Sequence, residues 1–220
     1  MKYLPSILLA ASMLSIGATA SHATVVFCFE ETEGTVKMTS SGFLDVSKLV
    51  SVARLGTWGG TGTEHNGAVG DIDIMGGTSF GGVDKSYEFS AGTDFSALTN
   101  PGGPFSFSNF AVSVITGSVS FTTYSGFVDG LRVAGIGIVE ADLVGDIWTP
   151  DQMWTYSPGA SFASLGLNEG VWSVSDAVSG ETITIKIGQG RAPAVPDSGA
   201  TLALLGAGLV GMLAARRRRS

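Results

Sequence analysis

The sequence has very few of the residues that build disulfides and metal sites. Cys28 is the only cysteine in 220 residues, and His22 and His65 are the only histidines. A lone cysteine excludes an internal disulfide and a thiolate metal cluster, and the alternation of residues 25–29 predicts a buried strand position for it. If His22 is removed with the N-terminal segment, only His65 remains. That excludes most histidine metal sites and any two-histidine mechanism.

Basic residues are also scarce in the body of the chain, residues 24–199. Lys2 and the four terminal arginines account for five of the 12 basic residues, so the body holds seven against 19 acidic residues, a net charge of −12. This charge argues against nucleic acid and anionic membrane surfaces as partners of the body. It is compatible with solubility in a matrix or with cation binding.

The N-terminus has the parts of a secretory signal peptide. Lys2 precedes a mostly apolar stretch, residues 7–16, and two small-x-small patterns follow it: Ala18-Thr19-Ala20 and Ser21-His22-Ala23. We predict a signal peptide over residues 1–23, cleaved after Ala23 so that Thr24 becomes the first residue. Cleavage after Ala20 is the alternative.

The C-terminus consists of a turn motif, an apolar run and a basic block. The motif is Val195, Pro196, Asp197, Ser198 and Gly199; residues 200–215 carry no charge, and the block is Arg216, Arg217, Arg218 and Arg219. A helix over 200–215 spans roughly 24 Å and needs modest bilayer thinning to cross a ~30 Å hydrocarbon core. The arginines favour the cytoplasmic side, so they predict a cytoplasmic stop after a transmembrane helix, with the body outside.

In this order at the extreme terminus, the three parts resemble the PEP-CTERM class of sorting signals, and residues 195–199 match its VPDSG-CTERM variant. The resemblance implies recognition by an exosortase, an integral-membrane cysteine transpeptidase of Gram-negative bacteria that make exopolysaccharide. It further implies a precursor held in the inner membrane by 200–215, removal of the tail, and transfer to the cell envelope or extracellular matrix. A sortase signal would have leucine at Val195 and threonine at Ser198, and a plain C-terminal anchor is a further alternative.

Between the two signals, residues 24–188 are predicted to form one all-β domain, an antiparallel β-sandwich or jelly-roll-like fold, followed by a spacer over 189–194. The chain has 32 glycines, 14% charged residues and 44% hydrophobic residues, which is typical of a turn-rich β protein. No amphipathic helix of three or more turns appears. Two hairpins are predicted besides the opening one over 24–40: residues 110–114 with 118–122, and 171–177 with 182–187. Residues 57–70 are predicted to be a loop.

The acidic and aromatic residues of the body suggest three kinds of chemistry. Asp71 and Asp73, with Asp84 nearby, suit Ca²⁺, and Glu140, Asp142 and Asp146 offer carboxylates for glycoside hydrolysis. The four tryptophans, Trp58, Trp148, Trp154 and Trp172, suit sugar stacking if exposed and core packing if not. In each case the structural role is the better explanation, so we assign no catalytic, cofactor-binding or metal residue.

The sequence therefore predicts an exported protein of the cell surface or extracellular matrix, sorted by an exosortase-type system, with a structural or adhesive role and no enzymatic activity. The alternatives are a carbohydrate-binding module for exopolysaccharide and, after it, a secreted glycoside hydrolase. Exopolysaccharide is accordingly a candidate ligand, and no cofactor is implied.

Overall fold

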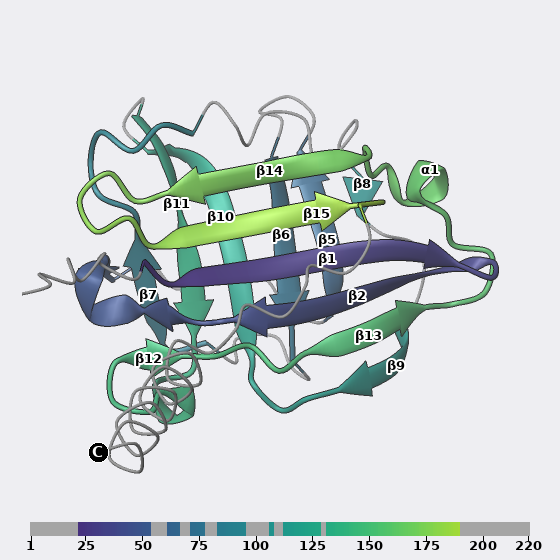
Figure 1. Cartoon of the computed structure of the whole chain (residues 1–220), viewed down its shortest axis with the longest axis horizontal. Coiled ribbons are helices and arrows are strands. Elements are labelled where there is room, and N and C mark those ends of the chain that lie inside the picture. The colour runs from purple at the N-terminus through teal and green to yellow at the C-terminus, as the bar shows by residue number, and fades with distance from the viewer. Residues whose placement is uncertain are drawn as a thin grey trace, which may run out of the picture.

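The computed structural model describes residues 22–53, 61–66, 71–77, 83–95, 106–107, 112–128 and 131–189 (Figure 1). The predicted signal peptide up to residue 21, the spacer from residue 190, the motif at 195–199, the helix at 200–215 and the arginine block lie outside the described residues. Within the described ranges, no helix is long and apolar enough to cross a membrane.

Strands arranged in two large sheets and one small sheet make up most of the described chain, so the all-β prediction is confirmed. In spatial order, the six-stranded sheet contains β14 (Gly170–Ser175), β15 (Thr182–Ile187), β1 (Thr24–Thr32), β2 (Thr35–Gly42), β13 (Met153–Tyr156) and β9 (Val112–Thr116). The seven-stranded sheet contains β4 (Val50–Val52), β7 (Lys85–Glu88), β11 (Leu131–Ile138), β10 (Phe121–Val128), β6 (Asp71–Gly76), β5 (Gly62–Asn66) and β8 (Ser106–Phe107). The small sheet pairs β12 (Ile147–Trp148) with β3 (Leu44–Asp45).

In the residues that the structure describes, the helical elements are short and lie outside the sheets. They are α1 (Phe162–Leu165) and the 3₁₀ turns η1 (Val46–Lys48) and η3 (Glu140–Asp142). Ser161 begins α1 with a reciprocal capping box to Ser164, and Gly166 ends it in the left-handed conformation, φ 68°.

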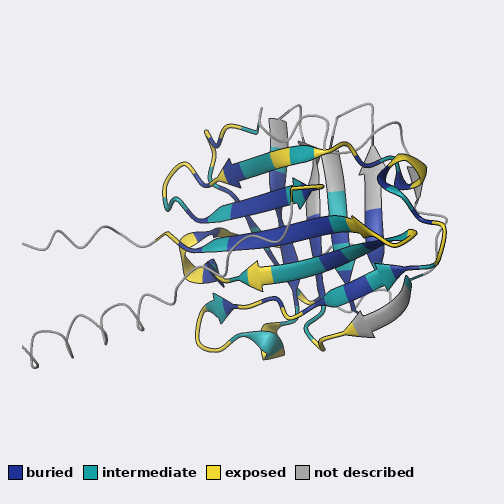
Figure 2. Ribbon diagram, turned by 45° about the vertical axis from the view of Figure 1, so that its right-hand side comes forward, coloured by how far each residue is buried: buried dark blue, intermediate teal, exposed yellow. Residues whose placement is uncertain are grey.

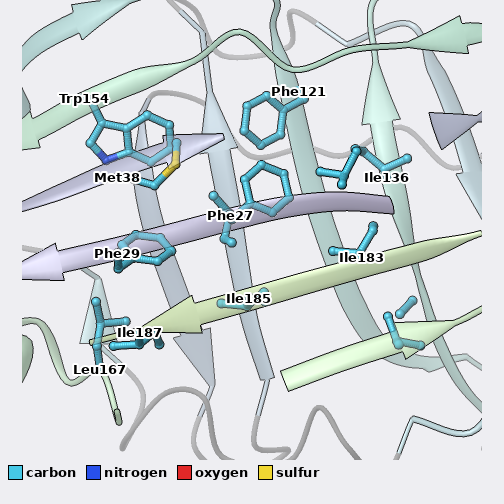
Figure 3. Packing of buried hydrophobic residues seen from close by; sticks show 14 of the residues in the cluster. Phe27, Phe29, Met38, Phe121, Ile136, Trp154, Leu167, Ile183, Ile185 and Ile187 are labelled. Atoms are coloured by element: carbon cyan, nitrogen blue, oxygen red, sulfur yellow. The ribbon is translucent and has the colours of Figure 1, made fainter. Parts of the chain in front are cut away.

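The six-stranded sheet crosses in front of the seven-stranded sheet, and one hydrophobic core draws on both (Figure 1). The rings of Phe27 on β1 and Phe121 on β10 stack with their centroids 5.2 Å apart, and Trp148 meets Phe121 edge-on at 5.4 Å. Figure 3 shows Phe27 and Phe121 facing each other, with Ile183, Ile185 and Ile187 spaced along β15. Figure 2 shows the buried positions concentrated in the strands and many of the exposed ones at turns.

The first and last described strands are neighbours in the six-stranded sheet. β1 pairs with β2 as the predicted hairpin, and β14 with β15 as the other. β1 and β15 run parallel, from the pair Thr24–Thr182 to the pair Phe29–Ile187. The prediction of an entirely antiparallel fold is wrong at this pair. Because almost the whole domain separates the two strands in sequence, no hairpin turn forces them to run in opposite directions.

Two further predictions are corrected. The segment 57–70 was predicted to be a loop but contains β5, which pairs with β6 and β8. The proposed hairpin over 110–122 does not form: β9 pairs with β13, whereas β10 pairs with β11 and β6 in the other sheet. The link between β9 and β10 is held by Asp151, whose carboxylate accepts from the amides of Ser118 (3.0 Å) and Val119 (3.1 Å).

Candidate functional site

The position from which the sorting tail leaves the domain is fixed by the end of β15. The amide of Gly188 donates to the carbonyl of Phe29 at 2.9 Å, and Gln189 is the last described residue. Because β1 and β15 are parallel, the chain enters at the Thr24 end of the pair and leaves at the Ile187 end. At about 3.3 Å per residue, these two ends lie roughly 17 Å apart.

A shallow pocket of about 320 Å³ lies beside this exit. It is lined by Glu30, Glu31, Thr32, Phe162, Glu169 and Gly188. The carboxylate of Glu31 accepts from the amide of Phe162 at 2.8 Å and so holds the start of α1. The pocket therefore combines an aromatic side chain with three glutamates, and sequence reasoning did not find it because its residues come from three distant segments.

Three of the carboxylates suggested for calcium or for hydrolysis, Asp84, Asp142 and Glu140, have structural partners. Asp84 accepts from the amide of Glu140 at 2.7 Å, and Asp142 accepts from the amide of Ser120 at 3.3 Å. Glu140 forms an exposed ion pair with Lys85 at 3.4 Å. In the part of the chain that the structure describes, no group of three or more His, Cys, Asp or Glu residues is placed to hold a metal ion.

Asp71 and Asp73 both lie on β6, but the side chain of Asp71 lies outside the described residues. Asp146 is exposed. His65 lies on β5, and its side chain is likewise outside them. Cys28 is buried on β1, which confirms the predicted strand position.

The tryptophans are mainly part of the core. Trp148 and Trp154 are 0% exposed, and Figure 3 shows Trp154 beside Met38 inside the domain. Neither can stack on a sugar from solution, so sugar stacking is wrong for these two residues. Trp172 is half-buried, and a Cβ added at Gly170 would lie 2.6 Å from its ring. Trp58 lies outside the described residues.

Two buried carboxylates, Glu181 and Asp176, organise the end of the domain where β15 begins. Glu181, with a side chain 0% exposed, accepts from the amides of Asp45 (2.8 Å) and Ala23 (3.4 Å) and from Lys48 Nζ (3.3 Å). Asp45 also pairs with Lys48 at 3.2 Å. The hydrogen bond from the Ser47 hydroxyl lowers the pKa of Asp45, and the hydrogen bond to Asp45 raises the pKa of Lys48.

Asp176 closes the turn between β14 and β15. Its carboxylate accepts from the amides of Ser90, Val178 and Ser179 and from the Ser179 hydroxyl. Burial acts to raise the pKa of Asp176, but these hydrogen bonds outweigh it and lower the pKa to about 2. The spacing of Asp176 and Ser179 is a local turn signal that sequence reasoning could have used. Glu181 has no such signal, because its partners lie far away in sequence.

One comparison with known proteins bears on the tail. Residues 194–219 match the family model of the VPDSG-CTERM motif. No curated protein and no solved structure matches the chain.

The chain thus carries a PEP-CTERM-like exosortase sorting signal, and the predicted recognition is confirmed. The signal indicates an exported protein whose precursor transits the membrane and is processed by an exosortase-type enzyme. The match covers the tail only, so it carries no information about the task of the domain.

Proposed function

We propose that this chain is a structural or adhesive protein of the cell envelope or extracellular matrix, without enzymatic activity, and that its two facing sheets form a β-sandwich. The observation that carries the proposal is the place where the sorting tail joins the domain. The tail follows β15, which is an internal strand with β14 on one side and β1 on the other.

A pull on the chain that follows β15 acts along this strand and loads both of its ladders at once. Six residue pairs join β15 to β14, and six join it to β1. The ladder hydrogen bonds run across the strands, so the force shears them together instead of breaking them one after another. A domain attached through such a strand is suited to remain folded under tension, as a surface or matrix protein must.

The use of the carboxylates supports a structural role as well. Asp151, Asp176 and Glu181 all accept hydrogen bonds from backbone amides that come from other segments of the chain. These groups hold loops and strand ends in place. In an enzyme of the glycosidase type, two carboxylates would instead face each other across a cleft.

The sorting step is tested by a double substitution in the motif, Pro196→Ala with Asp197→Ala, in the full chain. We expect the variant to accumulate as a membrane-held precursor that retains its C-terminus, measured by mass spectrometry of the membrane and extracellular fractions. Pro193→Ala, in the spacer just before the motif, is the matched control and should be processed as the natural chain is. Release of a shortened double variant at the natural rate would contradict the proposal.

Exopolysaccharide binding is the second candidate, and the pocket beside the tail exit favours it. Phe162, which is 7% exposed, adds an apolar wall to the pocket, and Glu169 offers an exposed hydrogen-bond acceptor for sugar hydroxyls. We expect Glu169→Gln to weaken binding on a glycan array several-fold, whereas Asp146→Asn, which changes an exposed carboxylate outside the pocket, should not. Equal binding by both variants and the natural chain, or no binding by any of them, would exclude this candidate.

A further inference from the structure

Two residues ahead of β1 belong to the folded domain. The Nδ1–H group of His22 donates to the carbonyl of Ser179 at 2.8 Å, and its ring covers Gly180, where an added Cβ would lie 2.7 Å from the ring carbon Cε1. Ala23 is only 2% exposed. Both residues would be lost from a mature protein that begins at Thr24.

Ala23 also extends the pairing of β1 with β15. The amide of Thr182 donates to the carbonyl of Ala23 at 2.9 Å, one residue before the first strand pair, Thr24–Thr182. The amide of Ala23 donates to the carboxylate of Glu181 at 3.4 Å. A chain that starts at Thr24 lacks both of these backbone groups.

The loss of Ala23 is costly because the side chain of its partner Glu181 is 0% exposed. A buried carboxylate needs hydrogen-bond donors to compensate for the water that it gives up. Ala23 supplies one such donor, beside the amide of Asp45 and the ammonium group of Lys48. Removing Ala23 would leave the buried charge with two of these three partners.

We propose that signal peptidase cuts after Ala20, so that the mature protein begins with Ser21 and keeps His22 and Ala23 in the fold. Hydrolysis of the Ala20–Ser21 bond consumes one water and leaves a carboxylate on Ala20 and an amino group on Ser21. This replaces our sequence-based choice of Ala23 with its alternative. The inference concerns the N-terminus alone and does not depend on the proposed role of the domain.

The two sites can be blocked separately, because each needs a small residue three positions before the cut. Ala18→Phe removes that residue from the Ala20 site, and Ser21→Phe removes it from the Ala23 site. The contacts on which the inference rests are made by His22 and Ala23, and neither substitution replaces those residues.

The experiment is export of the full chain, followed by mass spectrometry of the N-terminal peptide. We expect Ser21 as the first residue of the natural chain, at least a tenfold slower loss of the precursor for Ala18→Phe, and normal processing at the same bond for Ser21→Phe. A first residue at Thr24, or at any other position, would overturn the proposal. So would normal processing of Ala18→Phe together with arrest of Ser21→Phe.

Discussion

The segments β9–β10 and β14–β15 look alike in sequence but fold differently. In both, two apolar strands flank a short polar segment with a glycine, Gly117 in the first and Gly180 in the second. The second is a hairpin, whereas the first carries the chain from one sheet to the other. The hydrogen bonds that hold each connecting segment explain the difference.

The β14–β15 turn is closed by its own residues. The amide of Asp176 donates to the carbonyl of Glu181 at 2.8 Å, and the amide of Gly180 donates to the carbonyl of Asp176 at 2.9 Å. In the β9–β10 link, the amides of Ser118 and Val119 bind Asp151, more than 30 residues away. A local pattern therefore predicts a turn reliably when the bonds that form it are also local.

The largest effect is expected from Asp176→Ala, which breaks the locally closed turn. The substitution leaves the amides of Ser90, Val178 and Ser179 without their acceptor. At about 1 kcal/mol for each donor left unpaired, we expect the free energy of unfolding to fall by roughly 3 kcal/mol. Urea denaturation of the mature chain measures this change.

Asp151→Ala is the matched control for that experiment. The carboxylate of Asp151 is more exposed than that of Asp176, and it binds two adjacent amides that water can reach. The free energy of unfolding should therefore fall clearly less than for Asp176→Ala. Equal losses for the two variants would mean that local closure of the turn makes no difference to stability.

A smaller difference in the free energy of unfolding is expected between Gly117→Ala and Gly180→Ala. Both glycines have positive φ, 96° and 76°, so alanine strains the backbone at each. A Cβ at position 117 would also lie 2.7 Å from the backbone carbon of Asp151, whereas at position 180 it would meet the ring of His22, which can move aside. We expect Gly117→Ala to cost about 2–3 kcal/mol and Gly180→Ala about 1 kcal/mol in the same urea assay. The reverse order would show that the crossing adapts more easily than the hairpin.

An effect confined to acid pH concerns the pH dependence of stability that Asp176 gives to its turn. Its pKa is about 2 in the folded protein against an ordinary value of 3.8, so its carboxylate is harder to protonate when the chain is folded. The resulting stability, about 2 kcal/mol, is present above pH 3.8 and is lost as the pH falls toward 2. We expect Asp176→Asn to have a flatter stability curve between pH 4 and pH 2, measured by urea midpoints. An unchanged slope would contradict the assigned role of the turn hydrogen bonds.

The contiguous signals were predictable from the sequence, and the long-range pairings were not. The alternation of residues 25–29 and of Ile183, Ile185 and Ile187 predicts strands that the structure contains, with the three isoleucines buried. The sorting motif was recognisable for the same reason, because its parts follow one another in the chain. β5 was missed because its glycine-rich surroundings hide the period of two.

No local sequence pattern predicts the pairings that join distant segments. Neither the parallel β1–β15 pair nor the pairing of β9 with β13 could be inferred from the residues of the strands. The same holds for Glu181, whose donors Ala23 and Asp45 lie more than 130 residues before it, and for the pocket at the tail exit. These features depend on the order and pairing of the strands, which cannot be inferred from the sequence of a single chain.

The placement of β15 between β14 and β1 also sets the order of events during export. The first strand to emerge from the translocation channel must wait for the last one before the six-stranded sheet is complete. Until then, the edge of β1 that β15 will cover stays open, which favours wrong pairing with other chains. The sheet therefore closes at about the moment when the sorting tail arrives behind β15, so that the processing enzyme meets a domain that has only just finished folding.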